Sequence, residues 1–141
     1  MTVREMEKLD DTGLKAWDDH DANALLALFA DKFEWHDDGL PEPMRTREEV
    51  RQFMNGWFTA FPDMHVKRTN RVANDDSVGV ELEFTGTNTG PMVMGDKQMP
   101  ATNKSVNAHG TYFVRTKNGK IVEFHSHPNI GEMLTQLGVQ G

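Results

Sequence analysis

Two histidines near the C-terminus are spaced so that both imidazoles leave the same side of one strand. His125 and His127 are two residues apart, and Asn129 continues the series if the strand extends that far. Imidazole titrates close to neutral pH, so either histidine can act as a general base toward a substrate carbon. The amide of Asn129 can donate a hydrogen bond to an enolate oxygen. If this face is concave, the spacing predicts acid/base chemistry in a cavity; otherwise the face contacts solvent or a dimer partner.

Two further histidines, His109 and His36, are candidates to assist this acid/base chemistry. Pairing across an Asn-Gly turn at 118–119 predicts His109 opposite Pro128, beside the histidines of the final strand; a hydrogen-bonded surface position is the alternative. His36 precedes Asp37-Asp38, and histidines with a carboxylate are typical ligands of zinc or non-haem iron. Acidic residues after a strand more often solvate a turn, so we expect no metal there.

Aromatic, methionine and arginine side chains are the candidates for substrate contact. Aromatic residues can line the mouth of a cavity, although helical spacing is also typical of plain core. Flexible thioethers in a long loop suit a lid over a planar apolar ligand, or packing against a partner subunit. An arginine before a helix can receive a carboxylate or enolate, or simply lie at the surface. The predicted substrate contacts are Trp17, Trp35, Arg45, Phe53, Trp57, Met92 and Met94.

Length and composition restrict the class of protein. The chain has 141 residues, which predicts one domain over residues 1–141. It contains no cysteine, which excludes disulfides, thiolate nucleophiles and cysteine-ligated metals. A net charge of −7 argues against nucleic acid as a partner, and no apolar run is long enough for a membrane helix. With no secretory signal visible, we expect a cytoplasmic protein.

The order of helical and strand patterns predicts an α+β fold. Apolar residues recur at three- and four-residue steps in the first third of the chain, and Thr46-Arg-Glu-Glu49 has the spacing of a capping box. Alternation with a period of two follows Met64, whereas residues 86–104 are predicted to form a long functional or mobile loop. The predicted helices are 4–17, 21–30, 46–61 and 129–137, and the predicted strands are 33–36, 78–84, 106–115 and 120–127.

These elements predict a curved antiparallel sheet wrapped around the N-terminal helices. The apolar stripes of the helices must bury against one face of the sheet. A bent sheet with a long helix across it leaves a cone that side chains need not fill. A small-molecule pocket would form inside this cone.

Five short motifs resemble those of the SnoaL-like polyketide cyclases and related ester cyclases. They follow in family order over roughly residues 30–138, with His36 upstream: Ala60-Phe-Pro-Asp63, Gly86-Thr-Asn-Thr-Gly90, Pro100-Ala-Thr-Asn-Lys104, Asn118-Gly-Lys-Ile-Val-Glu123 and Gln136-Leu-Gly138. The resemblance implies the cone-shaped α+β barrel of the nuclear transport factor 2 superfamily and a homodimer formed through the sheet. It also implies ring closure by aldol condensation without metal or cofactor.

The resemblance ends at the residue that carries the family's chemistry. In the characterised cyclases the general acid/base aspartate lies about seven residues before Gln-Leu-Gly, where this chain has Asn129. Asn88 stands where the family often has a histidine. An amide cannot take up a proton near neutral pH, so a histidine of the final strand would have to serve as the base.

The sequence leaves three hypotheses for function open. The first is an enzyme that performs cofactor-free acid/base chemistry, of aldol cyclisation, isomerisation or dehydration type, on a small apolar carbonyl or polyketide-like substrate. On this hypothesis, replacing His125 by alanine would abolish turnover. The second is a non-catalytic module of the same fold that binds an apolar or aromatic ligand. The third is a hydrolase, hydratase or hydroxylase variant, because this superfamily supports several reactions on one scaffold.

Overall fold

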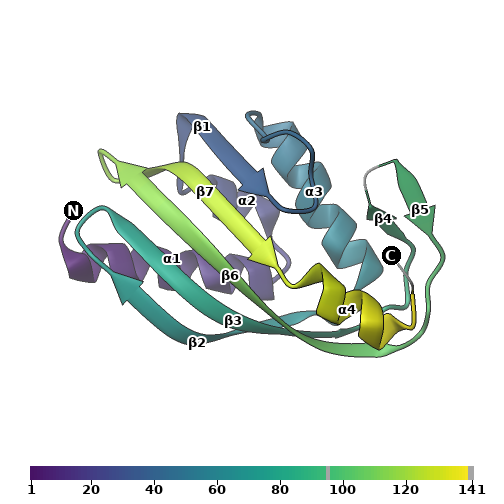
Figure 1. The fold of residues 1–141 in the computed structure, drawn as a ribbon. Helices are drawn as coiled ribbons and strands as arrows, with labels where there is room; N and C mark the ends of the chain where they lie inside the picture. Colours follow the sequence, from purple (N-terminus) through teal and green to yellow (C-terminus); the bar gives the residue numbers. More distant parts are fainter. Residues whose placement is uncertain (95, 140–141) are drawn as a thin grey trace.

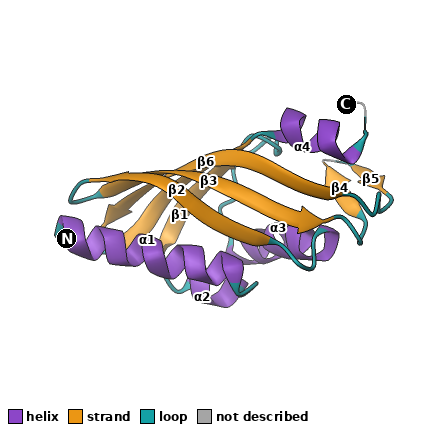
Figure 2. Ribbon diagram, turned by 90° about the horizontal axis from the view of Figure 1, so that it is seen from below, coloured by secondary structure: helices purple, strands orange, loops and turns teal. Residues whose placement is uncertain are grey.

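The computed structural model describes residues 1–94 and 96–139 (Figure 1). Its helices are α1 (Val3–Asp18), α2 (Ala22–Leu26), α3 (Arg47–Ala60) and α4 (Ile130–Leu137). Its strands are β1 (Phe29–Asp37), β2 (His65–Ala73), β3 (Ser77–Thr87), β4 (Met92–Met94), β5 (Lys97–Met99), β6 (Ser105–Lys117) and β7 (Lys120–Pro128). Helices α1, α2 and α3 cover one face of a curved sheet (Figure 2). None of these described helices has the length and apolar character needed to cross a bilayer.

The sheet is mixed rather than purely antiparallel. Its strand order is β1-β7-β6-β3-β2, and all neighbours are antiparallel except β1 and β7, which run parallel. The predicted α+β fold, with a curved sheet against N-terminal helices, is confirmed; the parallel β1 is the difference. An alternating pattern identifies a strand, but it does not set the direction in which that strand pairs with a distant one.

The helices begin where side chains satisfy free backbone N–H groups. Both α1 and α3 start with a threonine–glutamate capping box, which at α3 is the predicted pair Thr46 and Glu49. The helix predicted over 21–30 is shorter, because α2 ends at Leu26. Phe29 begins β1 instead and pairs with β7, so sheet pairing overrides the local helical pattern.

A bulge in β7 decides which of its side chains face the helices. The β6–β7 hairpin turns at Asn118-Gly119, where both residues have positive φ, as an Asn-Gly turn predicts. The ladder then pairs Ile121 and Glu123 with consecutive residues of β6 and skips Val122. An extra residue of this kind reverses the alternation of side chains along the strand. Before the bulge the odd-numbered Ile121 is buried, and after it the even-numbered Phe124 is buried instead. The rest of the strand therefore directs its even-numbered side chains toward the helices.

Helix α4 covers the part of β6 that β7 leaves without a partner. Gln136 accepts a hydrogen bond from the N–H of Asn107 (2.6 Å) and donates one to its carbonyl oxygen (2.9 Å). Glu132 accepts one from the N–H of His109 at 2.6 Å. These side chains replace a neighbouring strand, while Met133 and Leu137 are buried in the core. The start of α4 is thereby fixed at the end of β7.

The segment predicted as a long loop is partly ordered by one buried amide. Residues 92–99 contribute the two short strands β4 and β5. Asn88 is fully buried; it donates to the carbonyl oxygens of Ala60 (3.0 Å) and Gly90 (2.9 Å) and accepts from the N–H and hydroxyl of Thr102. Asn88 therefore joins the end of α3 to both ends of this segment.

Replacing Asn88 by alanine is expected to lower the free energy of unfolding by about 2–4 kcal/mol, because several buried backbone groups lose their partner at once. Urea denaturation of the purified variant measures this loss. Thr89→Ala changes the neighbouring exposed residue and is expected to stay within about 0.5 kcal/mol of the wild type. Equal stability of the two variants would contradict a structural role for Asn88.

Candidate functional site

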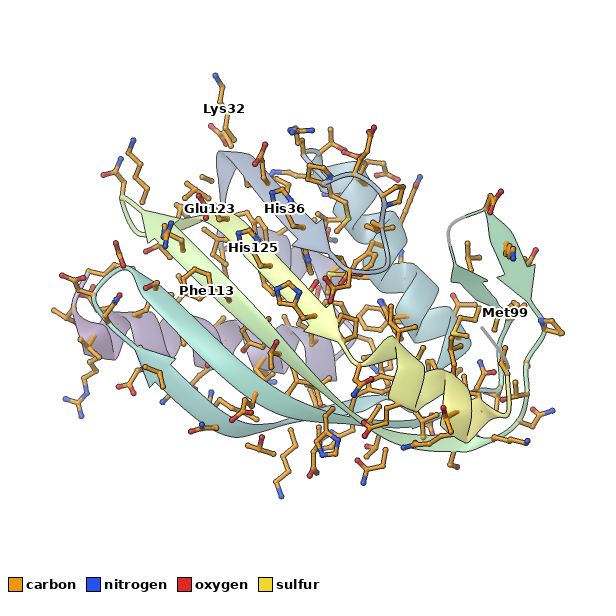
Figure 3. The ribbon with its side chains drawn as sticks, viewed as in Figure 1. Lys32, His36, Met99, Phe113, Glu123 and His125 are labelled. Carbon is orange, nitrogen blue, oxygen red and sulfur yellow. The ribbon has the colours of Figure 1, made fainter. Side chains whose placement is uncertain are left out.

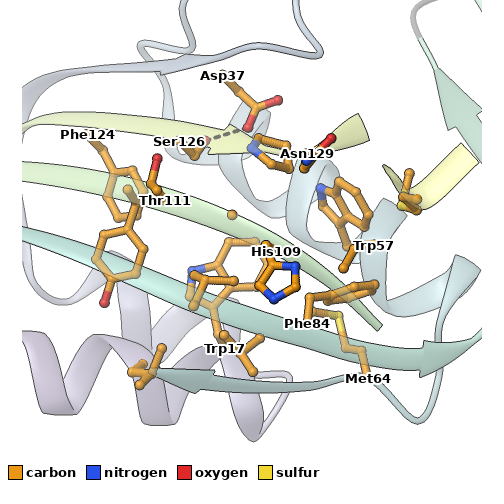
Figure 4. Close-up of a pocket in the computed structure, with 18 of the residues that line it drawn as sticks. Trp17, Asp37, Trp57, Met64, Phe84, His109, Thr111, Phe124, Ser126 and Asn129 are labelled. Atoms are coloured by element: carbon orange, nitrogen blue, oxygen red, sulfur yellow. Dashed lines mark hydrogen bonds between the residues drawn. The ribbon is translucent and has the colours of Figure 1, made fainter. Parts of the chain in front are cut away.

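An apolar cavity lies between the inner face of the sheet and helices α1 and α3. It encloses about 740 Å³ of space, counted to include its open mouth. All three tryptophans of the chain, Trp17, Trp35 and Trp57, border it. Phe84 and Phe124 contribute aromatic surface from the sheet (Figure 4). A cavity with this lining suits a small, largely apolar ligand.

One buried carboxyl group belongs to this cavity. Asp37 is the last residue of β1 and is only 8% exposed. It lies beside Ser126 of β7, whose hydroxyl donates a hydrogen bond to it (Figure 4). The N–H of Gly39 donates to the second carboxyl oxygen at 2.8 Å, and the indole N–H of Trp35 donates to the Ser126 oxygen at 2.8 Å. These contacts hold the carboxyl group in a fixed orientation.

Burial changes the acidity of this group. Removal from water raises the pKa of the Asp37 carboxyl above the ordinary aspartate value of 3.8. The hydrogen bonds from Ser126 and Gly39 oppose this shift by stabilising the charged form, but the effect of burial is larger. A carboxyl group whose pKa is raised holds a proton more readily than an ordinary aspartate and can both accept and return one, which is the property of a general acid/base.

Removing the Ser126 hydroxyl is expected to raise the pKa of Asp37 further, by about one unit, because the carboxylate loses a hydrogen bond that stabilises it. The test is a carbon-13 NMR titration of the Asp37 carboxyl in Ser126→Ala. Ser126→Thr retains a hydroxyl and is the matched control, with a pKa close to that of the wild type. A pKa that stays the same or falls in Ser126→Ala would show that the hydroxyl does not position this carboxyl.

Asn129 lies at the mouth of the same cavity. Its side-chain oxygen accepts a hydrogen bond from the N–H of Glu132 at 3.0 Å, which caps the start of α4. The amide N–H groups are therefore the hydrogen-bonding function that Asn129 can offer to a ligand. β7 ends at Pro128, so Asn129 does not continue the strand series of His125 and His127.

A second buried carboxylate fastens α1 to the sheet. Asp10 is 3% exposed, and the hydroxyl of Tyr112 donates a hydrogen bond to it. Arg68 and Arg71 of β2 lie 2.9 and 3.4 Å from the same carboxylate oxygen. Burial and the adjacent Asp10 charge both raise the pKa of Tyr112. The Tyr112 ring forms part of the cavity wall, but its hydroxyl is engaged by Asp10, so this cluster supports the wall.

Comparison with protein families matches residues 8–137 to the SnoaL-like polyketide cyclases. The chain belongs to this family. A comparison with curated proteins gives no match.

Solved structures with the same fold include three of particular interest. AclR from Streptomyces galilaeus, for which hydroxylase activity is suggested, is 22% identical, with a TM-score of 0.83 over 97% of this chain and 83% of AclR. IdmH from Streptomyces antibioticus, suggested to be a polyketide cyclase, is 24% identical, with a TM-score of 0.75 over 94% and 98% of the two chains. A hypothetical protein with a ketosteroid isomerase-like fold from Catenulispora acidiphila, in complex with trimethylamine, is 20% identical, with a TM-score of 0.75 over 94% and 93% of the two chains.

Within this SnoaL-like fold, the histidines predicted to face the cavity lie on the opposite side of the sheet. His125 stacks on His36 with ring centroids 4.9 Å apart, near Phe113 (Figure 3). Their nearest carboxylates are Glu123 and Glu34, at 3.5 and 3.3 Å. Neither histidine borders the cavity. The expectation that His125 faces it is wrong, because the bulge in β7 reverses the alternation on which that expectation was based. The expectation for His36 is wrong as well, because His36 alternates along β1 with Trp35 and Asp37, which both border the cavity.

The other predicted polar residues also have partners outside the cavity. The imidazole of His127 lies 2.9 Å from Asp38. His109 borders the cavity, but its side chain is 60% exposed and its Nδ1 lies 2.9 Å from Glu132. That contact raises the pKa of His109. Arg45 is exposed and binds a surface glutamate of β1.

The predicted apolar contacts agree better with the structure. Trp17, Trp35, Phe53 and Trp57 all border the cavity. Met92 borders an adjacent hollow instead. The side chain of Met94 lies outside the described part of the structure.

Within residues 1–94 and 96–139, no three histidine, aspartate or glutamate side chains are grouped so that they could hold a metal ion.

Asp37 and Ser126, which are hydrogen-bonded to each other, are polar cavity residues that sequence reasoning missed. Asp37 was interpreted only as a turn residue or metal ligand. The spacing of Asp37 gave a usable signal, because Asp37 lies on the same face of its strand as the apolar residues Phe33 and Trp35, which are both buried. Ser126 gave no such signal, because its side of β7 depends on the bulge.

Proposed function

We propose that this SnoaL-like protein is an enzyme that performs cofactor-free general acid/base chemistry on a small, largely apolar carbonyl compound. The observation that carries the proposal is the buried carboxyl of Asp37 in a largely apolar cavity, with burial raising its pKa. An aspartate in this position replaces the histidines as the proposed base. The match to the SnoaL-like polyketide cyclase family supports acid/base chemistry on this fold.

The proposed reaction begins with ionised Asp37. Its carboxylate accepts a proton from the carbon next to the substrate carbonyl, which leaves an enolate and a neutral carboxyl group. The amide N–H of Asn129 donates a hydrogen bond to the enolate oxygen. Return of the proton to a different carbon gives isomerisation. Attack of the enolate on a second carbonyl of the same molecule closes the ring, and the neutral Asp37 carboxyl then gives its proton to the new alkoxide oxygen, which yields the aldol product and restores the carboxylate. Asn129, in the place of the family's aspartate, thus acts as a donor and not as the base.

The experiment uses alkyl phenyl ketones, which carry an exchangeable hydrogen next to a carbonyl. Binding is followed by quenching of tryptophan fluorescence, since all three tryptophans border the cavity. Proton-deuterium exchange of bound propiophenone in deuterated buffer is followed by NMR. We expect saturable binding and exchange well above the rate in buffer. Saturable binding with exchange at the buffer rate would contradict the proposed chemistry and favour the non-catalytic binding module.

The outer face of the sheet is the proposed homodimer surface. It presents the stacked His36 and His125 with the half-buried Phe113, and carboxylates and basic groups alternate around them. Such a mixed surface can be complementary to a second copy of itself. Sedimentation analysis of Phe113→Glu against the wild type tests this: the variant is expected to be monomeric, and an unchanged dimer would exclude this face.

A further inference from the structure

A second hollow adjoins the main cavity on the side of α3 and β4. It encloses about 530 Å³ of space, counted to include its opening. Asp37, Phe53, Trp57 and Met133 border both hollows, so these four side chains form the boundary between them. The carboxyl proposed as the base therefore lies where the two hollows meet.

The floor of the second hollow contains a glycine that the backbone does not require. Gly56 lies inside α3, where glycine is less favourable than alanine. Its φ is not positive, in contrast to that of Gly138, which ends α4. A Cβ atom built on Gly56 would meet no atom within 4 Å, whereas one on Gly90 would collide with the backbone of Thr59. Neither backbone conformation nor close packing accounts for Gly56, which leaves the space above it as the reason.

We infer that the second hollow is a substrate subsite, kept open by Gly56, and that the ligand spans both hollows with its carbonyl group at Asp37. The position of the carbonyl rests on the proposed function; the subsite itself rests on the hollow and on Gly56. The ligand class is a ketone with two apolar arms. The tryptophan-rich main cavity suits an aromatic arm.

The second hollow suits a flexible aliphatic arm. Met92 and Met133 border it, and their unbranched thioether side chains adapt to ligands of different shape. Leu40 and Ile130 add aliphatic surface. No aromatic ring lies there apart from the two shared with the main cavity, among the described residues that border this hollow. Longer arms should therefore bind more tightly until the hollow is filled.

The test measures binding of propiophenone and octanophenone, which share the phenyl ring and carbonyl but differ by five methylene groups. In the wild type we expect octanophenone to bind about 200-fold more tightly, from roughly threefold for each of the five buried methylenes. In Gly56→Leu a side chain enters the second hollow, and this affinity ratio is expected to fall at least about tenfold. Asn55→Leu is the matched control, because it places the same side chain on the exposed neighbouring position of α3.

Two further variants test the subsite even if Gly56→Leu fails to fold. Gly56→Ala is expected to melt about 2–4 °C higher than the wild type, since alanine favours the helix, and to lower the ratio only slightly. Val93→Trp fills the hollow from an exposed position of β4 and is expected to lower the ratio as Gly56→Leu does.

The outcomes separate this inference from the proposed function. An affinity ratio that is the same in the wild type, Gly56→Leu and Val93→Trp would overturn the subsite. A loss of affinity of equal size for both ketones would overturn it as well, because the two hollows would not act separately. Failure of the wild type to accelerate exchange would contradict the chemistry alone, since the affinity ratio is measured without any reaction.

Discussion

Replacing Asp37 by asparagine is expected to slow protein-dependent exchange of propiophenone by about 10²–10⁴-fold, while the affinity for the ketone stays within about threefold. The amide has nearly the same shape as the carboxyl group, so the cavity keeps its walls, but it cannot accept a proton near neutral pH. NMR exchange rates at saturating ketone, together with fluorescence titrations, separate the two effects.

Asp38→Asn is the matched control for this prediction. Asp38 follows Asp37 directly, but its side chain is exposed and lies 2.9 Å from His127 outside the cavity. His125→Ala tests the earlier candidate in the same assay. Both variants are expected to retain exchange within about threefold of the wild type, an effect far below that of a lost general base. A loss in His125→Ala that matches the loss in Asp37→Asn would reject Asp37 as the sole base.

Replacing Asp37 by asparagine also has a defined effect on the stability of the protein. Because burial raises the pKa of Asp37 in the folded state, that state holds the proton more tightly than the unfolded chain does. Stability of the wild type therefore falls as pH rises from about the ordinary value of 3.8 through the raised pKa. Asp37→Asn lacks this dependence, so its melting temperature should gain on that of the wild type as pH rises across this window.

Replacing Asp10 by alanine is expected to lower the free energy of unfolding by about 3–5 kcal/mol. The change leaves the hydroxyl of Tyr112 buried without its acceptor. It also removes the buried counter-charge of Arg68 and Arg71, whose side chains are 27% and 20% exposed. Chemical denaturation at neutral pH measures the loss.

Asp11→Ala provides the comparison for Asp10. Asp11 contacts the same two arginines, at 2.7 and 2.8 Å, but its side chain is 56% exposed. Exposed ion pairs contribute little, so this variant is expected to cost about 0–1 kcal/mol. If Asp11→Ala proved as destabilising as Asp10→Ala, the burial of the Asp10–Tyr112 pair would not be what fastens α1 to the sheet.

Local signals in the sequence predicted local structure well. The Thr46–Glu49 capping box and the Asn118-Gly119 turn each depend on a few adjacent residues, and both are present. The parallel pairing of β1 with β7 joins segments about ninety residues apart, so no local pattern could set its direction.

The candidate site was predicted in position but not in its chemistry. Four of the predicted aromatic contacts border the cavity, because large apolar side chains are buried on helices and strands alike, whatever the pairing within the sheet. The polar residues depended on the alternation along β7. One unpaired residue, Val122, places Ser126 inside and His125 outside. A bulge of this kind has no clear signature in a single sequence. The spacing that places Asp37 on the same face of its strand as Trp35, in contrast, can be read directly from the sequence.

A carbon-13 NMR titration of the Asp37 carboxyl, without and with bound propiophenone, tests the central claim most directly. Burial in the ligand cavity predicts a pKa above 3.8 in the free protein and a further rise when the ketone displaces water from around the carboxyl group. A pKa at or below 3.8 that does not respond to the ketone would contradict the assignment of Asp37 as the acid/base group of this cavity.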